Sequence, residues 1–295
     1  MRYAYYPGCS LKSSAYDYER STRAICPELG VELEEIHDWN CCGATAIPSV
    51  DPTASAVLAA RNLALAEATD VNGAEAVTVA AACSSCYAML TRALNYYRED
   101  PAMRGLIGQA LAAGGRTLAG TVKVKHLLEI IVNDVGLEAV KALVRKPLSG
   151  LKVAPYYGCL IVRPKGAFDD AEQPMALDRL LAVLGAQVVP FERKTKCCGG
   201  ALMTTKEKSA LRLNEDLLHE ASSKGADVIA VVCPMCQMNL DAYQSNVNTA
   251  YGTHYRMPVM YFTQLMGLAF GLNERRLAVG KGTVSHAAVL KRMGV

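Results

Sequence analysis

The sequence predicts an α/β protein of two pseudo-symmetric halves, each a small parallel sheet with flanking helices and a cysteine cluster at the strand ends. Ten of the eleven cysteines form one five-cysteine pattern that occurs twice. Each cysteine group follows a short β-branched or apolar run, and helical patterns fill the intervals. Strands that alternate with helices form parallel sheets, whose carboxyl strand ends meet at one edge. The first copy is Cys9, Cys41, Cys42, Cys83 and Cys86, and the second is Cys159, Cys197, Cys198, Cys233 and Cys236.

The individual elements repeat in the same order as the cysteines. In the first half, strand-like runs lie in Arg2–Gly8, Gly30–Glu34 and Gly73–Val79, and helical patterns span Ser13–Leu29, Pro52–Thr69 and Tyr87–Tyr97. In the second half, the matching runs lie in Lys152–Gly158, Gly185–Val189 and Gly225–Val231, and helical patterns span Gln173–Leu184, Thr205–Ser223 and Met235–Asn246. Pro52 and Pro174 are expected in first helical turns, where proline is tolerated.

Between the repeats, Pro101–Pro147 reads as mainly helical, with a short strand at Val122–His126. The best linker is Arg145–Gly150, which divides the chain into domains 1–147 and 148–295. The basic tail Asn273–Val295 is either a docking segment or a solvated end.

Composition excludes several classes of protein. About half of the 295 residues are apolar (51%) and 20% are charged, which suits a globular protein with a real core. A net charge of +3 is too small to indicate nucleic-acid binding. The N-terminus lacks a secretory signal, and the apolar stretches Ala74–Leu90 and Met257–Leu272 are too interrupted to span a membrane. We therefore expect a cytoplasmic protein, whose many thiols serve as metal ligands or redox groups rather than as a disulfide framework.

Three kinds of thiol site are compatible with the cysteine pattern. Structural zinc needs only four ligands, so the fifth cysteine of each copy argues against it, and adjacent cysteines fit poorly around one small ion. An iron–sulfur cluster spreads its irons over several ångströms and can accept adjacent thiolates, although four cysteines usually suffice. A thioredoxin-like dithiol at Cys233-Pro234-Met235-Cys236 would leave the other cysteines unexplained. Iron–sulfur binding is the favoured interpretation.

Residues outside the pattern receive structural roles. Cys26 lies in a helical pattern and is expected to be a small buried apolar residue. The five histidines (His37, His126, His219, His254 and His286) follow no duplicated pattern, and each is expected to be structural or exposed. Trp39, just before Cys41 and Cys42, is expected to fill core, and shielding of a cluster is the alternative.

The motifs resemble a known family. The repeated Cys-Cys-Gly and Cys-x-x-Cys groups look like the cysteine-rich CCG domain, and two copies with the openings Tyr5-Tyr6-Pro7-Gly8-Cys9 and Tyr156-Tyr157-Gly158-Cys159 resemble the B subunit of heterodisulfide reductase. The resemblance implies two noncubane [4Fe–4S] clusters, each held by the five cysteines of one copy, with a substrate disulfide between them. It also implies two partners, which are the ferredoxin-like C subunit and the flavin-containing A subunit of a heterodisulfide reductase-type complex.

On this basis we expect an oxidoreductase component that cleaves, or in reverse forms, a disulfide of a thiol coenzyme or related compound. This chain carries no flavin or NAD motif of its own, so electrons must arrive through a partner. Lys196, Tyr157, Arg163 and Met235 flank the ligands and are the candidate cleft residues. The alternative is a CCG-type electron-transfer component of a lactate, glycolate, glycerol-phosphate or quinone-linked oxidoreductase, and a zinc-stabilised scaffold is a non-enzymatic alternative.

Overall fold

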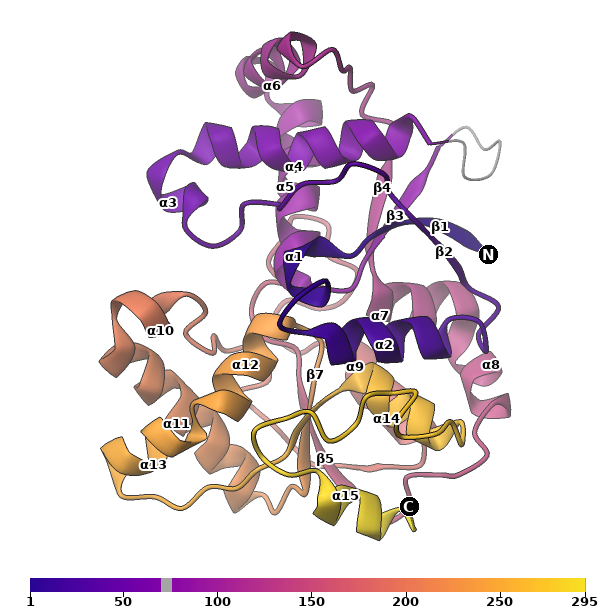
Figure 1. Cartoon of the computed structure of the whole chain (residues 1–295), viewed down its shortest axis with the longest axis vertical. Coiled ribbons are helices and arrows are strands. Elements are labelled where there is room, and N and C mark those ends of the chain that lie inside the picture. The colour runs from indigo at the N-terminus through magenta and orange to yellow at the C-terminus, as the bar shows by residue number, and fades with distance from the viewer. Residues whose placement is uncertain (70–75, 295) are drawn as a thin grey trace.

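The computed structural model describes residues 1–69 and 76–294 and contains two four-stranded parallel sheets, one in each half (Figure 1). The first has the order β2-β1-β3-β4 and consists of β1 (Arg2–Tyr6), β2 (Glu32–Glu35), β3 (Thr78–Ala81) and β4 (Lys123–His126). The second has the order β6-β5-β7-β8 and consists of β5 (Lys152–Tyr156), β6 (Gln187–Val188), β7 (Val228–Val231) and β8 (Val259–Tyr261). The predicted fold class is confirmed.

The strand predictions differ from the structure in a few places. Residues 73–75 of the predicted Gly73–Val79 run lie outside the described residues. The strand expected at Val122–His126 is present as β4, which pairs with β3. Its counterpart β8 was missed because it is only three residues long and lies in a continuous apolar stretch, where strand and helix patterns cannot be told apart.

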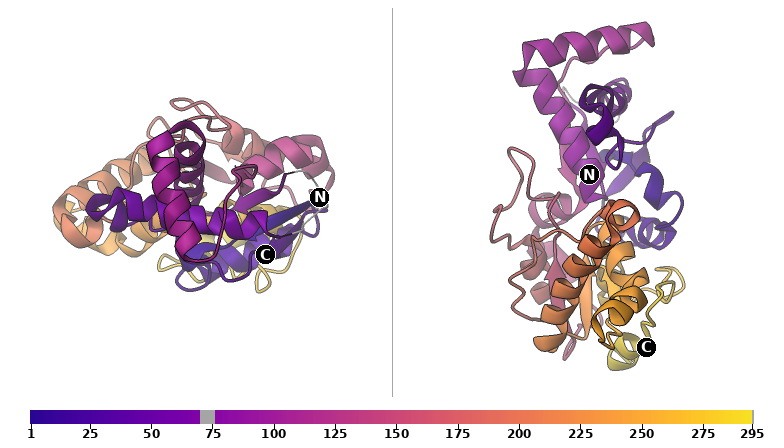
Figure 2. Two further views of the ribbon diagram at one scale, coloured as in Figure 1. Left: turned by 90° about the horizontal axis from the view of Figure 1, so that it is seen from above. Right: turned by 90° about the vertical axis from the view of Figure 1, so that its left-hand side faces the viewer.

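Helices connect the strands and cover the sheets. The first half contains α1 (Gly8–Leu11), α2 (Tyr16–Ile25), α3 (Ile47–Val50), α4 (Pro52–Glu67), α5 (Ser84–Glu99), α6 (Pro101–Ala113), α7 (Leu127–Glu129), the π-helical segment η1 (Ile130–Gly136) and α8 (Leu137–Ala142). The second half contains α9 (Ala176–Val183), α10 (Leu202–Thr205), α11 (Glu207–Ser223), α12 (Pro234–Ala242), α13 (Gln244–Tyr251), α14 (Phe262–Ala269) and α15 (Ala287–Arg292). Helix α6 lies at the end of the molecule farthest from the second half (Figure 2).

Two helix predictions need correction. Pro52 does begin α4, where the Asp51 carboxylate accepts a hydrogen bond from Ala54 N at 2.9 Å, but Pro174 precedes α9 rather than lying in its first turn. The predicted helix Met235–Asn246 is two helices, α12 and α13. The chain bends at this point because the buried Gln244 side chain hydrogen-bonds both backbone groups of Met257, which leads into β8.

The two halves join through a pseudo-twofold arrangement. Helix α2 of the first half packs on α14 of the second, and α9 of the second packs on α7 of the first. In the first contact, the Tyr18 and Tyr261 rings stack with centroids 4.1 Å apart, and the Ser21 and Thr263 hydroxyls are 2.7 Å apart. The linker expected at Arg145–Gly150 is non-helical and lies between α8 and β5. The domain limits 1–147 and 148–295 remain a prediction.

Residues 273–294 of the basic tail pack on their own chain, so a plain solvated end does not describe them, and a docking role remains a prediction. Leu277 and Val289 are buried, and the Asp241 carboxylate accepts hydrogen bonds from the backbone amides of Thr283 and Val284. No helix in the described parts of the chain is long and apolar enough to cross a membrane.

Candidate metal centre

The carboxyl edge of each sheet gathers the five cysteines of that half. Cys9 follows β1, and Cys41 and Cys42 follow β2 through a short loop. Cys83 follows β3 and is the N-cap residue of α5, so Cys86 lies in the first turn of that helix. The second half repeats this arrangement, with Cys233 as the N-cap residue of α12. A helix N-terminus carries partial positive charge, which favours thiolates at both Cys-x-x-Cys motifs.

The thiols lie in close pairs. In the first half, Cys9 and Cys41 Sγ are 3.8 Å apart, and Cys42 and Cys86 Sγ are 3.4 Å apart. In the second half, the Cys198 and Cys236 sulfurs are 3.6 Å apart, and Cys159 contacts Cys197. All eleven cysteines are free thiols. Within the described residues, no three His, Cys, Asp or Glu side chains converge closely enough to hold one metal ion.

The two cysteine sites touch each other across the boundary between the halves. Cys83 and Cys233 are both buried at this boundary, and each thiol shifts the pKa of the other. Ser85 Oγ lies 3.9 Å from Cys233 Sγ, and Ser84 Oγ donates to the Val232 carbonyl at 3.2 Å. The Cys-x-x-Cys motifs of the two halves therefore meet near the pseudo-twofold axis.

The donor set at each site suits a polynuclear cationic centre. Thiol contacts and burial raise the pKa of Cys86 and of Cys236 well above the ordinary value. Contacts with Cys159 and Cys198 lower the pKa of Cys197 to about 3, whereas the pKa of Cys198 is raised, so neighbouring thiols of one site do not ionise together. Ionising all five thiols is unfavourable unless a cation offsets their charge, which is what metal binding does. Iron–sulfur clusters take thiolate ligands of this kind.

Glycines leave room beside the sulfurs in both halves. Gly8 and Gly158 precede the first cysteine of each copy and have φ of +73° and +67°. A Cβ at Gly8 would lie 2.8 Å from Cys86 Sγ, and one at Gly158 would lie 2.9 Å from Cys236 Sγ. These distances are shorter than any real contact, so a side chain at either position would displace a ligand sulfur. The residues present fit a bulky thiolate-bound cluster in each half.

A tyrosine at the end of the first strand of each half fixes the Cys-Cys loop. Tyr6 donates a hydrogen bond to the Asn40 carbonyl at 2.7 Å, and Tyr156 donates to the Lys196 carbonyl at 2.8 Å. Each acceptor is the residue directly before the Cys-Cys pair. We missed these roles in the sequence, although the alignment of the two copies places Tyr6 and Tyr156 at matching positions.

Asparagines on the following helices support the same loops. Asn62 of α4 exchanges hydrogen bonds with the Asn40 backbone, and Asn214 of α11 donates to the Cys198 carbonyl at 3.1 Å. The second half has an additional contact, since Asn239 Nδ2 donates to the carbonyls of Cys198 and Gly200 and lies 3.6 Å from Cys198 Sγ. The sequence signal for the first pair was a polar residue in an otherwise apolar helix face.

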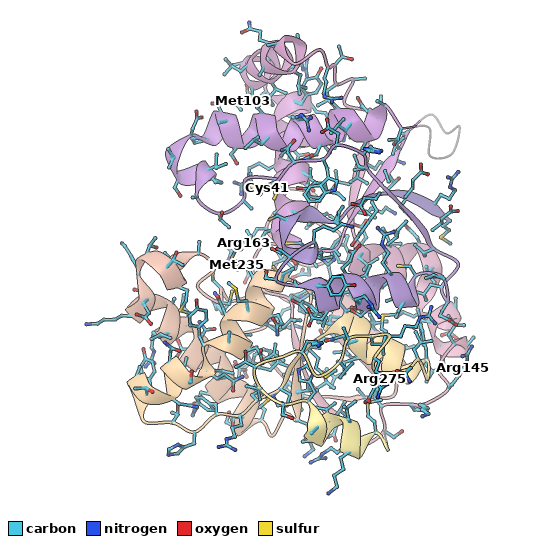
Figure 3. The ribbon with its side chains drawn as sticks, viewed as in Figure 1. Cys41, Met103, Arg145, Arg163, Met235 and Arg275 are labelled. Carbon is cyan, nitrogen blue, oxygen red and sulfur yellow. The ribbon has the colours of Figure 1, made fainter. Side chains whose placement is uncertain are left out.

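The four predicted cleft residues occupy different environments. Tyr157 is buried, and its hydroxyl donates to Asp178 and accepts from the backbone of α9, so this group is not free to face a substrate. Lys196 is exposed, and Met235 lies beside Gly200. Arg163 lies near enough to Cys197 to lower the pKa of that thiol. Arg163 and Met235 are labelled near the boundary between the halves in Figure 3, with Cys41 above them.

The remaining candidates have the structural roles expected of them. Cys26 is 2% exposed, and burial raises its pKa to about 12, as suits a small apolar residue. Trp39 is half-buried, packs edge-on against Tyr6 with ring centroids 5.6 Å apart, and donates to Glu35. His126 is fully buried at the end of β4, and burial lowers its pKa to about 4, which keeps the ring neutral.

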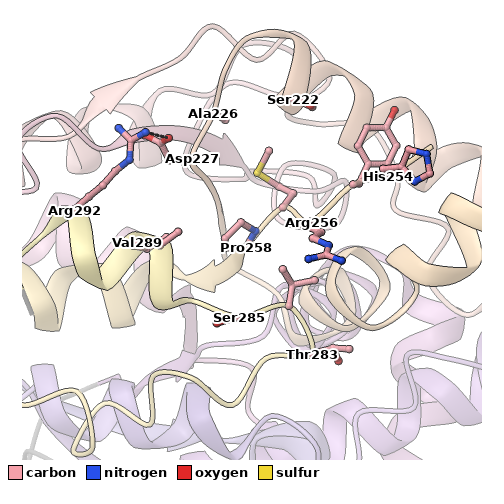
Figure 4. Close-up of a pocket in the computed structure, with 14 residues that line it drawn as sticks. Ser222, Ala226, Asp227, His254, Arg256, Pro258, Thr283, Ser285, Val289 and Arg292 are labelled. Carbon is pink, nitrogen blue, oxygen red and sulfur yellow. Dashed lines mark ion pairs between the residues drawn. The ribbon is translucent and has the colours of Figure 1, made fainter.

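A cavity of about 750 Å³ lies at the opposite edge of the second sheet (Figure 4). Asp227 and Pro258, which precede β7 and β8, line it together with His254 and Arg256. Its Arg292 side chain forms an ion pair with Asp227 at 3.0 Å. Because the cysteines follow the carboxyl ends of the strands, this cavity is separate from the metal centre.

Comparisons with known proteins agree with this geometry. The model of the CCG cysteine-rich domain matches residues 3–91 and 153–241. The chain is 38% identical to the 8-methylmenaquinol:fumarate reductase membrane anchor subunit of Wolinella succinogenes, covering 96% of each chain. It is 30% identical to the B subunit of the ferredoxin/F420H2-dependent CoB-CoM heterodisulfide reductase of Methanosarcina acetivorans, over 97% of this chain and 95% of that protein.

Two further matches extend the comparison. A protein of Archaeoglobus profundus that is described as like the heterodisulfide reductase B subunit is 30% identical, over 99% of this chain and 98% of that protein. The crystal structure of a hypothetical protein from Helicobacter pylori shares the fold, with a TM-score of 0.75, 14% identity, and coverage of 96% of this chain but 52% of that one. The chain therefore belongs to the family of heterodisulfide reductase B subunits, with one cysteine-rich CCG domain in each half.

Proposed function

We propose that this chain is an electron-transfer and catalytic component of a multi-subunit oxidoreductase, holding one noncubane [4Fe–4S] cluster in each half. The ligands would be the five cysteines of each copy: Cys9, Cys41, Cys42, Cys83 and Cys86 in the first half, and Cys159, Cys197, Cys198, Cys233 and Cys236 in the second. When bound, each cluster would supply a one-electron redox centre. The observation that carries the proposal is the meeting of the two Cys-x-x-Cys motifs, where Ser85 Oγ of the first lies 3.9 Å from Cys233 Sγ of the second.

Adjacent one-electron centres suit a two-electron substrate. Cleaving a disulfide consumes two electrons and two protons and yields two thiols, and two neighbouring centres can deliver those electrons singly. The activity named for the 30% identical heterodisulfide reductase relatives supports this chemistry. The first candidate substrate is therefore a disulfide, or the corresponding thiols in the reverse direction. Arg163, next to the second site, is the predicted cleft residue whose side chain is best placed to meet such a substrate.

A second candidate is favoured by the 38% identical relative, which belongs to a methylmenaquinol:fumarate reductase. In that case the same two sites would relay electrons in a quinol-linked complex, and no disulfide would be cleaved. For either candidate we propose partner proteins that contribute the flavin and further redox centres, like the flavin-containing and ferredoxin-like subunits of heterodisulfide reductase, and a cytoplasmic location for the chain.

The first test is the iron and acid-labile sulfide content of anaerobically purified protein. About eight irons with matching sulfide are expected for two four-iron clusters. About two zinc ions without sulfide would contradict the proposal and favour a scaffold.

The second test distinguishes the two candidates. The dithionite-reduced protein is mixed with small disulfides, and thiol release is measured. Two thiols for every two electrons lost support disulfide reduction. Reoxidation by menadione without thiol release from any disulfide supports the quinol-linked candidate.

A further inference from the structure

Two cavities related by the pseudo-twofold arrangement lie between the halves. Each is formed by the helix that begins at a Cys-x-x-Cys motif in one half and by the segment after the first cysteine in the other half. The smaller, about 460 Å³, lies between α5 and residues 163–165, and we call it the α5 cavity. The larger, about 810 Å³, lies between α12, the start of α2 and the C-terminal tail. The two cavities therefore occupy matching positions in the duplicated fold but differ in size and lining.

The charges of the α5 cavity are not balanced by internal pairing. Three cationic side chains line it, together with Glu99 and Asp100. Lys165 forms an ion pair with Glu99 at 2.7 Å, and the Asp100 carboxylate caps α6 by accepting from two backbone amides. Arg92 and Arg163 are exposed, and neither guanidinium makes a hydrogen bond or ion pair with another residue in the part of the chain that the structure describes. One guanidinium comes from each half, and both line the same cavity.

We propose that the α5 cavity binds a small oxyanion ligand, a carboxylate, phosphate or sulfonate, through Arg92 and Arg163. A guanidinium presents a planar set of donors that matches such groups, and the resulting charged hydrogen bonds are stronger than neutral ones. The volume falls in the range of small-molecule sites, and the Tyr96 ring and Pro164 supply apolar wall. The negative charge of the oxyanion would compensate the positive charges of Arg92 and Arg163, which have no carboxylate partner among the described residues.

The larger cavity lacks this arrangement, although it also contains cations. Its Arg20 already contacts the Tyr16 hydroxyl and the Arg275 carbonyl, each at 3.5 Å, and lies over the Tyr16 ring. The other cations that line it, Arg275 and Lys281, both come from the C-terminal tail, which has no counterpart among the residues lining the α5 cavity. Of the two cavities, only the α5 cavity is lined by one guanidinium from each half that has no partner among the described residues.

The bound group has two possible sources that share the same chemistry. It is either the anionic part of the redox substrate or a separate small anion. The position of the cavity accommodates both sources.

The test is calorimetric titration of the cluster-loaded protein with inorganic phosphate and with succinate. Arg92→Gln and Arg163→Gln are each expected to weaken binding about tenfold or more, since a charged hydrogen bond contributes roughly 1.5–3 kcal/mol. Lys165→Gln is the matched control, because its charge is already paired with Glu99, and an effect below about threefold is expected. Circular dichroism and iron content confirm that the variants are folded. The proposal is overturned if the wild-type protein binds neither anion, or if both arginine variants bind as tightly as wild type.

A second arm separates the two sources and rests on the proposed disulfide activity. Dithiodiglycolate is an anionic disulfide and cystamine a cationic one. If the cavity holds the substrate's own anionic group, Arg163→Gln raises KM for dithiodiglycolate and not for cystamine. If it holds a separate anion, phosphate binding falls while both KM values stay unchanged. The titration is independent of turnover, so failure of the disulfide activity leaves the binding result intact.

Discussion

The two cysteine sites have the same ligand framework but different surroundings. Cys9 and Cys41 of the first site are exposed, whereas their counterparts Cys159 and Cys197 are partly covered. The glycine before the first cysteine and the tyrosine that fixes the Cys-Cys loop occur in both halves. The arrangement around the cysteines is thus the same in both halves while their solvent access differs, so the two proposed clusters are expected to have different redox properties.

The second difference lies three residues after each Cys-x-x-Cys motif. Asn239 in the second half points an amide N–H at Cys198 Sγ, at 3.6 Å, and Met89 stands at the matching position of the first half. A thioether cannot donate a hydrogen bond. Hydrogen bonds to ligand sulfurs stabilise the additional negative charge of a reduced cluster and so raise its reduction potential.

Removing one ligand from each half in turn is expected to have the largest effect. Cys198→Ala should abolish or distort only the second cluster, and Cys42→Ala only the first, so about half of the iron remains in each variant. Cys26→Ala, which changes a buried thiol outside both sites, should retain all of it. Iron analysis and low-temperature EPR are the measurements. Loss of all iron from a folded single variant would show that the two sites do not assemble independently.

Filling the glycine positions tests whether the shared framework is equally strict in both halves. Gly8→Ala and Gly158→Ala should each displace a ligand sulfur and deplete the cluster of the same half. Gly30→Ala and Gly225→Ala are matched controls, with φ of +65° and +70° and open space around the new Cβ. The controls should cost only the backbone strain, about 1–2 kcal/mol, without loss of iron. Equal iron loss in controls and test variants would assign the effect to strain alone.

Exchanging Asn239 and Met89 is expected to change potential rather than composition. Asn239→Met should lower the potential of the second cluster by tens of millivolts, where about 59 mV corresponds to a tenfold change in a one-electron equilibrium. Met89→Asn should raise the potential of the first. Redox titration followed by EPR measures both. If Asn239→Met leaves both midpoints unchanged, the amide serves only to support the Cys198 and Gly200 carbonyls.

The fold class could be predicted from the sequence because the same cysteine and strand pattern occurs in both halves. Two copies of five cysteines, each group placed after an apolar run, indicated parallel strands with ligands at their carboxyl ends, and the ten candidate ligands lie there. The sequence did not locate β8 or the break between α12 and α13. Strand β8 is only three residues long and lies in a continuous apolar stretch, so its pattern does not distinguish strand from helix. The break between the helices accompanies the hydrogen bonds of the buried Gln244 side chain to Met257, a contact between separate segments that a periodic pattern does not reveal.

The predicted cleft residues also show that position in the sequence does not reveal which side chains meet in the folded protein. Tyr157 was predicted to line the cleft because it lies near Cys159 in the sequence, but its hydroxyl hydrogen-bonds to Asp178 and to the backbone of α9. Arg163 was selected on the same grounds, but its partner in the α5 cavity, Arg92, comes from the other half and carries no local signal.

The sequence by itself determined the duplication, the α/β class and the ten thiols, because these follow from residue type and spacing within one half. Only the tertiary structure decided how the halves meet: that Ser85 lies against Cys233, that Cys9 and Cys41 are exposed while Cys159 and Cys197 are partly covered, and that two arginines line one cavity. These features arise where α2 packs on α14 and α9 on α7. Such packing depends on the shapes of two assembled surfaces, which a periodic pattern along one chain does not encode.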